Sequence, residues 1–179
     1  GLRRRCAAPG ETSGGSWTVD HVFTPAQRLI VFGSDPIALA IALLAGELGW
    51  SSMIVSTDGP PHPPAPGVAH RRDPPAAALT ALVPDAQTAI AVATHDSDYD
   101  ESAIVAALAT RAGYIGVLGA RRRIPERVER LRARGVTDAQ IERLRMPIGL
   151  PLGAATPREI AVSVTAQIIA QRRALENRE

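Results

Sequence analysis

The sequence predicts one α/β domain built on a doubly wound, mostly parallel β-sheet, with extra helices toward its carboxyl end. Three observations predict this fold class. Short apolar runs alternate with helical segments, the runs lack the polar alternation of half-exposed strands, and Gly, Pro or Asp separates the segments. Strands that alternate with helices form a parallel sheet with right-handed crossovers, and its central strands are apolar on both faces.

The amino-terminal residues 1–26 are predicted to form a linker or arm, with a short strand around residues 17–22. This segment is rich in Gly, Ser, Thr and Arg and shows no clean periodicity. The domain itself is predicted to span residues 27–179. Cys6 is the single cysteine, so the chain forms neither an intramolecular disulfide nor a cysteine-rich zinc site. This composition fits a reducing compartment, and we expect a cytoplasmic protein.

The first half of the domain begins with a strand, a helix and a second strand. Residues 28–32 form a short apolar run typical of a buried parallel strand. Residues 37–48 are predicted as a nearly all-apolar helix that Gly49 ends. The second strand follows at residues 51–55. Five prolines within residues 58–66 then require a surface loop, because proline fixes φ and has no N–H donor.

The middle of the chain continues the alternation. A strand, a short helix after two prolines, and a further strand are predicted at residues 68–70, 76–82 and 88–93. Asp98 and Glu101 have capping-box spacing, in which a side chain at the helix start and one three residues later bond each other's backbone. We therefore expect the next helix to cover residues 102–110.

The last third of the domain is predicted to hold one strand and three helices, at residues 114–118, 124–134, 138–145 and 157–173. Thr137 with Gln140, and Thr156 with Glu159, have the spacing of capping boxes ahead of the last two helices. Pro157 fits the first position of the final helix, where its missing N–H has no partner to lose.

Composition argues against two classes of partner. All 20 basic residues are Arg, but a net charge of +2 is too small to indicate nucleic-acid binding by itself. The longest apolar run, residues 36–46, is followed by Glu47 and is shorter than the roughly 20 residues of a membrane span. We therefore expect neither a nucleic acid nor a membrane among the partners.

The first candidate binding segment is Gly33-Ser34-Asp35, directly after the first strand of this Rossmann-like sheet. In such sheets ligands bind outside the carboxyl ends of the strands, where the strand order reverses. The segment has the spacing of a dinucleotide fingerprint, but Asp35 replaces its second glycine. Asp35 also fits as a helix N-cap, and its carboxylate repels a phosphate. A phosphate-binding turn and a purely structural turn therefore both remain open.

Ser56 follows the second strand near the position where a nicotinamide-binding fold carries a ribose-binding acid. Asp58 lies two residues later and leads into the proline loop. The serine, together with Asp35, weakens the case for NAD(P) binding, which we retain as an alternative.

A second candidate segment, Thr94-His95-Asp96, follows the strand at residues 88–93. His95 suits the role of base, ligand or hydrogen-bond donor because the unperturbed pKa of histidine is near neutrality. A structural loop explains the same residues. The spacing of one histidine among aspartates is not specific for a metal, and we assign no metal site.

Two further segments contribute candidate residues at the same edge of the sheet. Gly119-Ala120-Arg121-Arg122 follows the strand at residues 114–118, and guanidinium groups near a helix start bind phosphates. A solvated arginine run is the alternative. Gly149 and Gly153 bracket an apolar loop ahead of the final helix, and its amides either face a ligand or serve only the helix entry. No catalytic residue emerges from these patterns.

The order of motifs from Val92 onward resembles the carboxy-terminal Rossmann domain of the XdhC/CoxI family. The segments that carry the resemblance are Thr94-His95-Asp96, Asp100, Tyr114-Ile-Gly-Val-Leu-Gly119-Ala-Arg-Arg, Met146-Pro-Ile-Gly-Leu150, Gly153, Thr156-Pro-x-Glu-Ile-Ala161 and Gln167-Ile-Ile. The resemblance covers about residues 28–173. It is weaker at the front, where the family usually has Gly-x-Gly-His and Asp-Pro-Arg, and this chain has Gly33-Ser-Asp-Pro and Ser56-Thr-Asp.

The resemblance implies an accessory role in the maturation of molybdenum hydroxylases such as xanthine dehydrogenase or carbon monoxide dehydrogenase. Members of that family are thought to bind molybdenum cofactor (molybdopterin), assist its sulfuration and deliver it to the apoenzyme. The implied partner is then a hydroxylase apoenzyme, and the implied role is that of a chaperone more than of a catalyst. An NAD(P)-dependent oxidoreductase or redox sensor, and a non-enzymatic interaction module using the arginine-rich residues 126–145, remain as alternatives. Apolar outer helices also leave a homodimer open.

Overall fold

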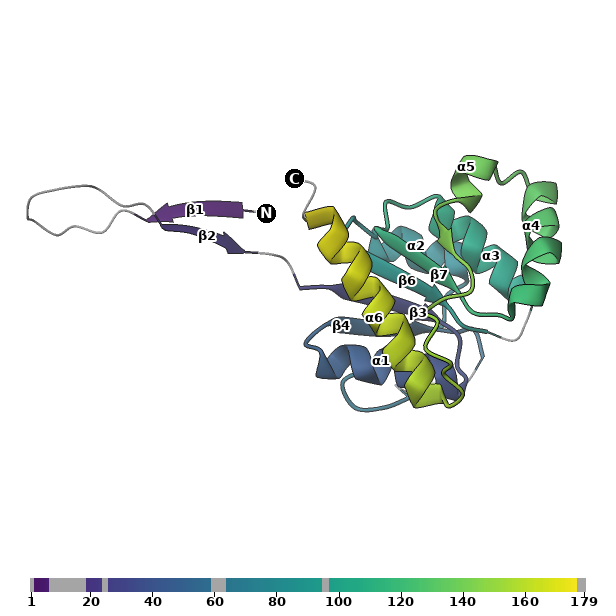
Figure 1. The fold of residues 1–179 in the computed structure, drawn as a ribbon, viewed down its shortest axis with the longest axis horizontal. Helices are drawn as coiled ribbons and strands as arrows, with labels where there is room; N and C mark the ends of the chain where they lie inside the picture. Colours follow the sequence, from purple (N-terminus) through teal and green to yellow (C-terminus); the bar gives the residue numbers. More distant parts are fainter. Residues whose placement is uncertain (1, 7–18, 24–25, 59–63, 95–96, 177–179) are drawn as a thin grey trace, which may run out of the picture.

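The computed structural model describes residues 2–6, 19–23, 26–58, 64–94 and 97–176. At its centre lies a six-stranded, all-parallel sheet in the order β5-β4-β3-β6-β7-β8 (Figure 1). The strands are β3 (Arg28–Phe32), β4 (Ser51–Val55), β5 (Ala69–Arg71), β6 (Thr88–Val92), β7 (Tyr114–Val117) and β8 (Leu144–Arg145). The predicted doubly wound α/β architecture is confirmed, and the first five of these strands lie within a residue of their predicted positions.

The strand order reverses between β3 and β6, which are hydrogen-bonded neighbours although 60 residues separate Phe32 from its partner Val92 in the register. Phe32 is also level with Val55 of β4, and Val92 with Val117 of β7. The last residues of four strands therefore line up along one edge. In this topology the reversal point at that edge is the expected ligand site.

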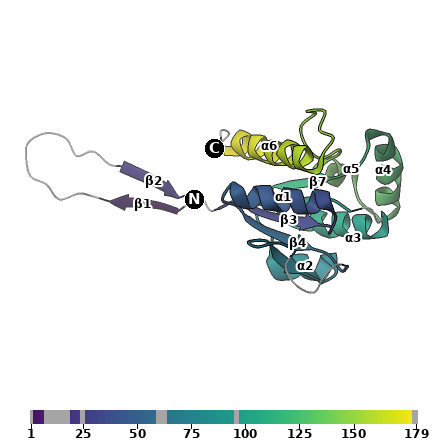
Figure 2. The same cartoon turned by 90° about the horizontal axis from the view of Figure 1, so that it is seen from below.

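Helices cover both faces of the sheet (Figure 2). One face packs against α1 (Pro36–Glu47) and α6 (Pro157–Glu176), the other against α2 (Pro75–Leu82), α3 (Ser97–Leu108) and α4 (Ile124–Ala133). Each strand serves both layers, since successive side chains point to opposite faces. In β3, Leu29 and Val31 join the core under α1 and α6, whereas Ile30 and Phe32 join the core under α2 and α3.

The start of α3 differs from its prediction. The helix begins at Ser97, not at residue 102, so Asp98 and Glu101 lie inside it and do not form a capping box. Glu101 is buried, accepts a hydrogen bond from the side chain of Arg130 and forms an ion pair with Arg134. Of the two acids that resembled a helix start, Glu101 is therefore an ion-pair partner of arginines about 30 residues later.

The helix predicted at residues 138–145 is also wrong in its second half. The helix α5 spans only Asp138–Ile141, and Leu144–Arg145 form the edge strand β8 beside β7. The capping box of Thr137 and Gln140 at the start of α5 is present as predicted. The sheet thus has a sixth strand of only two residues, which is too short for a hydrophobic periodicity to predict.

A separate two-stranded antiparallel ribbon, β1 (Leu2–Cys6) with β2 (Val19–Phe23), precedes the sheet (Figure 1). The strand expected around residues 17–22 overlaps β2. Across the described ranges, each helix is too short or too polar to traverse a lipid bilayer.

Candidate functional site

The carboxyl ends of β3 and β6 approach each other closely at the reversal point. Gly33 has a φ of +135°, and a Cβ atom at this position would lie 2.0 Å from the carbonyl oxygen of Ala93. The backbone ladder continues past the strands, since Ala93 N donates to the Phe32 carbonyl at 2.8 Å. Only glycine allows the two backbones to pack at this distance. Gly33 therefore has a structural requirement whether or not a ligand binds.

Asp35 caps α1, as predicted. Its Oδ1 accepts a hydrogen bond from the amide of Ala38 at 2.7 Å, and Pro36 occupies the first helical position. A carboxylate thus lies at the amino terminus where a dinucleotide-binding turn holds a pyrophosphate. Ser34 beside it is exposed. At the end of β4, the Ser56 hydroxyl donates to the Asp58 carbonyl at 2.8 Å, so it serves the local turn.

Thr94 begins a polar network that joins the ends of two strands. Its hydroxyl donates to Oδ1 of Asp100 in α3 at 2.7 Å. The other oxygen of Asp100 accepts from Nη2 of Arg127 in α4 at 3.0 Å. Arg127 then donates from Nη1 to the carbonyl of Leu118, after β7, at 3.1 Å. The ends of β6 and β7 are therefore tied together through two helices.

Arg127 also explains Gly119. A Cβ atom at Gly119, where φ is +152°, would lie 2.8 Å from Nη1 of Arg127. The guanidinium occupies the space that any side chain at this position would fill. Gly119 thus permits the turn out of β7 and leaves room for the buried arginine.

His95 and Asp96, the two other predicted residues of the Thr94 segment, lie outside the described residues. The remaining predicted residues are at the same edge of the sheet but divide into two groups. Gly33, Ser34, Asp35 and Thr94 follow β3 and β6. The second group, drawn from the turns after β7 and β8, lines a hollow: Gly119, Arg121, Gly149 and Gly153.

This hollow has a volume of about 660 Å³ and lies between the β7–α4 turn, the loop at residues 146–154 and α6. Its size falls within the range of roughly 300–1,000 Å³ that small-molecule sites occupy. Apolar side chains of Leu118, Ile148 and Ile160 form part of its wall. Ala120 and Arg122 flank Arg121 at its rim and are exposed. We define this hollow as the candidate site.

The loop that borders the candidate site is held by the side chain of Gln167 in α6. The amide of Gln167 bonds both backbone groups of Gly149, accepting from its N–H at 2.9 Å and donating to its carbonyl at 3.1 Å. The hydroxyl of Tyr114 donates to the same side-chain oxygen at 2.6 Å. Burial raises the pKa of Tyr114 well above its ordinary value, so the phenol stays a donor. The Gly149 amide is thus occupied within the fold and is not available to a ligand.

Ser163 holds the next residue of the loop. Its hydroxyl donates to the Leu150 carbonyl at 2.7 Å, and the Leu150 amide donates to the Ser163 carbonyl at 3.1 Å. A Cβ atom at Gly149 would lie 2.2 Å from the Ser163 hydroxyl oxygen, which explains the glycine. At the far end of the loop, Glu159 accepts from the amides of Ala155 and Thr156 at 2.9 Å each, completing the predicted capping box. These bonds lower the pKa of Glu159.

Donors without partners remain at the candidate site. Within the ranges that the structure describes, no hydrogen bond engages the amides of Gly153 and Ala154, or those of Ala120 and Arg121 at the start of the helical turn η1 (Arg121–Arg123). The guanidinium of Arg121 likewise has no ion-pair or hydrogen-bond partner among these residues. Free amides at a helix start and an unpaired guanidinium are donors for an anion such as a phosphate.

Four polar residues of this edge were not predicted as site residues: Asp100, Arg127, Ser163 and Gln167. Arg127 and Leu131 are the buried residues of α4 and lie four positions apart, so they share one face of the helix. An arginine in register with a buried leucine is the signal that could have identified it. Of the described residues, no three His, Cys, Asp or Glu side chains group closely enough to ligate a metal.

Comparison with known proteins agrees with this geometry. A family profile described as the XdhC Rossmann domain matches residues 29–168. A solved structure described as a xanthine dehydrogenase from Bacillus halodurans superposes with a TM-score of 0.72 at 26% identity, over 88% of this chain and 46% of that one.

Two of three curated relatives also have names connected with xanthine dehydrogenase or molybdenum cofactor. A protein of Bacillus subtilis described as a probable subunit of xanthine dehydrogenase is 32% identical over 83% of this chain and 44% of its own length. The molybdenum cofactor insertion chaperone PaoD of Escherichia coli is 27% identical over 84% and 42%. An uncharacterized Escherichia coli protein, YqeB, is 30% identical over 93% and 31%. The chain spans less than half the length of each of these relatives. Because the profile covers most of the domain, the chain belongs to the XdhC Rossmann domain family.

Proposed function

We propose that this chain is an accessory factor for a molybdenum hydroxylase of the xanthine dehydrogenase or carbon monoxide dehydrogenase type. In this role it binds molybdenum cofactor, or a related nucleotide, and assists sulfuration or insertion into the apoenzyme. Two relatives support a role in the maturation of such enzymes, one named for molybdenum cofactor insertion and one for xanthine dehydrogenase. We place this activity in the cytoplasm, in keeping with the single cysteine.

The observation that carries the proposal is the set of hydrogen-bond donors around the candidate site that have no partner among the described residues and could bind an anion. The pterin cofactor supplies a phosphate, which the Arg121 guanidinium and the amides of Gly153 and Ala154 would hold. The apolar residues that line the hollow suit a planar ring system, because a small-molecule site combines a largely apolar lining with a few placed polar groups. The residues present therefore fit the group.

The experiment compares cofactor retention in two arginine variants. Protein is expressed with and without molybdate, and mass spectrometry identifies the ligand carried by the purified chain. Arg121→Ala should reduce cofactor retention about tenfold or more, since a hydrogen bond to a charged group contributes about 1.5–3 kcal/mol. Arg123→Ala removes the same charge from the same turn but does not line the hollow, and it should leave retention unchanged. Equal retention in both variants would remove the phosphate assignment.

The NAD(P) alternative rests on the strand order, which is that of dinucleotide-binding folds. Asp35 at the start of α1 and the turn-bound Ser56 oppose it. A titration with NAD(H) and NADP(H) separates the proposals, because binding at micromolar concentration would favour an oxidoreductase or redox sensor over a cofactor chaperone.

The interaction-module alternative relied on the arginines of residues 126–145. Most of them are engaged within the chain: Arg127 with Asp100, Arg130 and Arg134 with Glu101, Arg132 with Asp138, and Arg143 with the Leu108 carbonyl. Their contacts are explained by the fold. Next to the candidate site, the arginines of the Arg121–Arg123 turn have no ion-pair partner among the described residues.

A further inference from the structure

The helix α1 has two apolar faces. One face consists of Ala38, Ile41, Ala42 and Ala45, which are buried against the sheet. The other face consists of residues spaced three or four apart: Pro36, Leu39, Ala40, Leu43, Leu44 and, at its end, Glu47. This spacing keeps them on one side of the helix. Glu47 is the single charged residue among the twelve of α1, so the helix has the composition of one that is covered all round.

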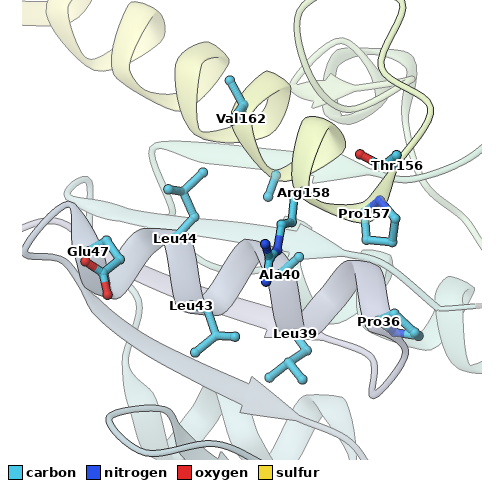
Figure 3. A pocket seen from close by; sticks show the side chains of 11 residues that line it. Pro36, Leu39, Ala40, Leu43, Leu44, Glu47, Thr156, Pro157, Arg158 and Val162 are labelled. Atoms are coloured by element: carbon cyan, nitrogen blue, oxygen red, sulfur yellow. The ribbon is translucent and has the colours of Figure 1, made fainter.

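The second face of α1 forms a groove with α6 (Figure 3). The groove has a volume of about 850 Å³, and its other wall includes Ala161, Val162 and Arg158. Two of its apolar side chains are well exposed, Leu43 at 41% and Val162 at 50%. Exposed apolar surface that is gathered in one groove is typical of an interaction site, whereas isolated exposed leucines are not.

We propose that this groove is the contact surface between two copies of the chain, related by a two-fold axis near Leu43. The charges of the groove argue for a second copy. Its residues include one acid, Glu47 at the carboxyl end of α1, and one base, Arg158, which lies over the amino-terminal half of α1 in Figure 3. No ion pair within the described ranges engages either side chain.

A two-fold contact requires a self-complementary surface, in which residue i meets residue j and j meets i. Antiparallel packing of one α1 across the other brings Glu47 of each copy toward Arg158 of its partner. The apolar residues between these two charges then meet their own symmetry mates. The same surface thus supplies an apolar centre and two matched charge pairs.

The oligomeric state tests this interface. Light scattering or sedimentation of the full chain should give the mass of a dimer, and Leu43→Arg should shift it to a monomer with unchanged circular dichroism. Val83→Arg is the matched control, because Val83 is an exposed apolar residue at the end of α2, on the other face of the sheet. A monomeric wild-type chain, or a dimer that survives Leu43→Arg, would overturn the proposal.

Cross-linking gives a positive test that does not depend on disruption. In a Cys6→Ser background, Leu43→Cys near the axis should form a disulfide-linked dimer on mild oxidation, and Val83→Cys should not. Glu47→Arg and Arg158→Glu should each raise the dimer dissociation constant, and the double variant should restore it. Cross-linking at Val83 as efficient as at Leu43, or a double variant as weak as the singles, contradicts the two-fold arrangement.

Discussion

Arg127 donates a hydrogen bond to Asp100 at 3.0 Å while both side chains are almost fully buried, at 9% and 6% exposure. The pair links α3 to α4, and its outer contacts reach Thr94 after β6 and the Leu118 carbonyl after β7. Removing one partner from a buried ion pair leaves an uncompensated charge, which costs more than the pair itself contributes. The pair therefore joins the segment after β6 to the turn after β7, which borders the candidate site.

Asp100→Asn should lower the free energy of unfolding by about 3–5 kcal/mol, the usual cost of breaking a buried ion pair. Urea denaturation measures it. The control is Asp138→Asn. Asp138 forms an ion pair with Arg132 at 2.7 Å, but the side chains of Arg132 and Asp138 are 56% and 74% exposed. An exposed pair contributes about 0–1 kcal/mol, so this variant should lie close to wild type. Equal losses of unfolding free energy in the two variants would show that the contribution of the Asp100 pair to stability does not come from its burial.

Two glycines of the loop beside the candidate site permit a matched comparison. Gly149 and Gly153 both have positive φ, +94° and +72°. An added Cβ would lie 2.2 Å from the Ser163 hydroxyl at Gly149 but would meet nothing within 4 Å at Gly153. Gly153→Ala should therefore cost only the backbone strain of about 1–2 kcal/mol, and Gly149→Ala should cost clearly more.

Thermal unfolding of the two alanine variants, with and without Ser163→Ala, separates the cost of backbone strain from the cost of the steric clash with Ser163. Ser163→Ala removes the oxygen that the new methyl group would strike, so it should recover part of the loss in Gly149→Ala. It should recover none in Gly153→Ala. If Ser163→Ala worsens both variants by the same amount, the Gly149 requirement does not arise from Ser163.

The strands β3, β4 and β6 were predictable because each buries apolar side chains on both faces of the sheet. Residues 28–32, 51–55 and 88–92 contain few polar side chains, and their positions in the centre of the sheet require that composition. The N-cap Asp35 and both capping boxes were equally predictable, because a cap is a contact between residues three apart.

The errors share one physical origin, which is that long-range contacts decided the local structure. The partners of Asp100 and Glu101 follow them by about 30 residues, so the acids that were interpreted as preceding a helix at residue 102 lie inside a helix that begins at Ser97. The strand β8 exists because Leu144 and Arg145 pair with Ile115 and Gly116. At the candidate site, the predicted residues are those nearest the strand ends, whereas Gln167 and Ser163, which were not predicted, reach it from the middle of α6.

Val83 offers a route to a more stable protein. It ends α2 with a φ of +46° and exposes 72% of its side chain. A β-branched residue in the left-handed region is strained, and glycine is the usual residue at this helix-terminating position. Val83→Gly should raise the free energy of unfolding by up to about 1 kcal/mol. Ala77→Gly, an exposed site inside the same helix, should lower it by about 1 kcal/mol. Chemical denaturation that gives both variants the same sign would contradict this interpretation.

Tyr99 should make the fold sensitive to alkaline pH. Burial, followed by the nearby charge of Asp58, raises the pKa of Tyr99 to about 12 from an ordinary value of 10.0. The folded state thus prefers the neutral phenol, whose hydroxyl donates to the Val55 carbonyl at 3.3 Å. Because the folded pKa is above the unfolded one, this contribution to stability is complete below pH 10 and is lost as pH rises toward 12.

The measurement is the free energy of unfolding of wild type and Tyr99→Phe as the pH rises from neutrality. The difference between them should change above pH 10 in favour of the variant, which has no phenol to ionise at this position. Part of the alkaline loss should persist, because the second of the two tyrosines, Tyr114, is also buried and has a raised pKa. Phenolate absorbance follows the ionisation directly, and wild type should ionise later than free tyrosine. A parallel pH dependence in wild type and Tyr99→Phe would mean that Tyr99 ionises as easily in the folded chain as in the unfolded one.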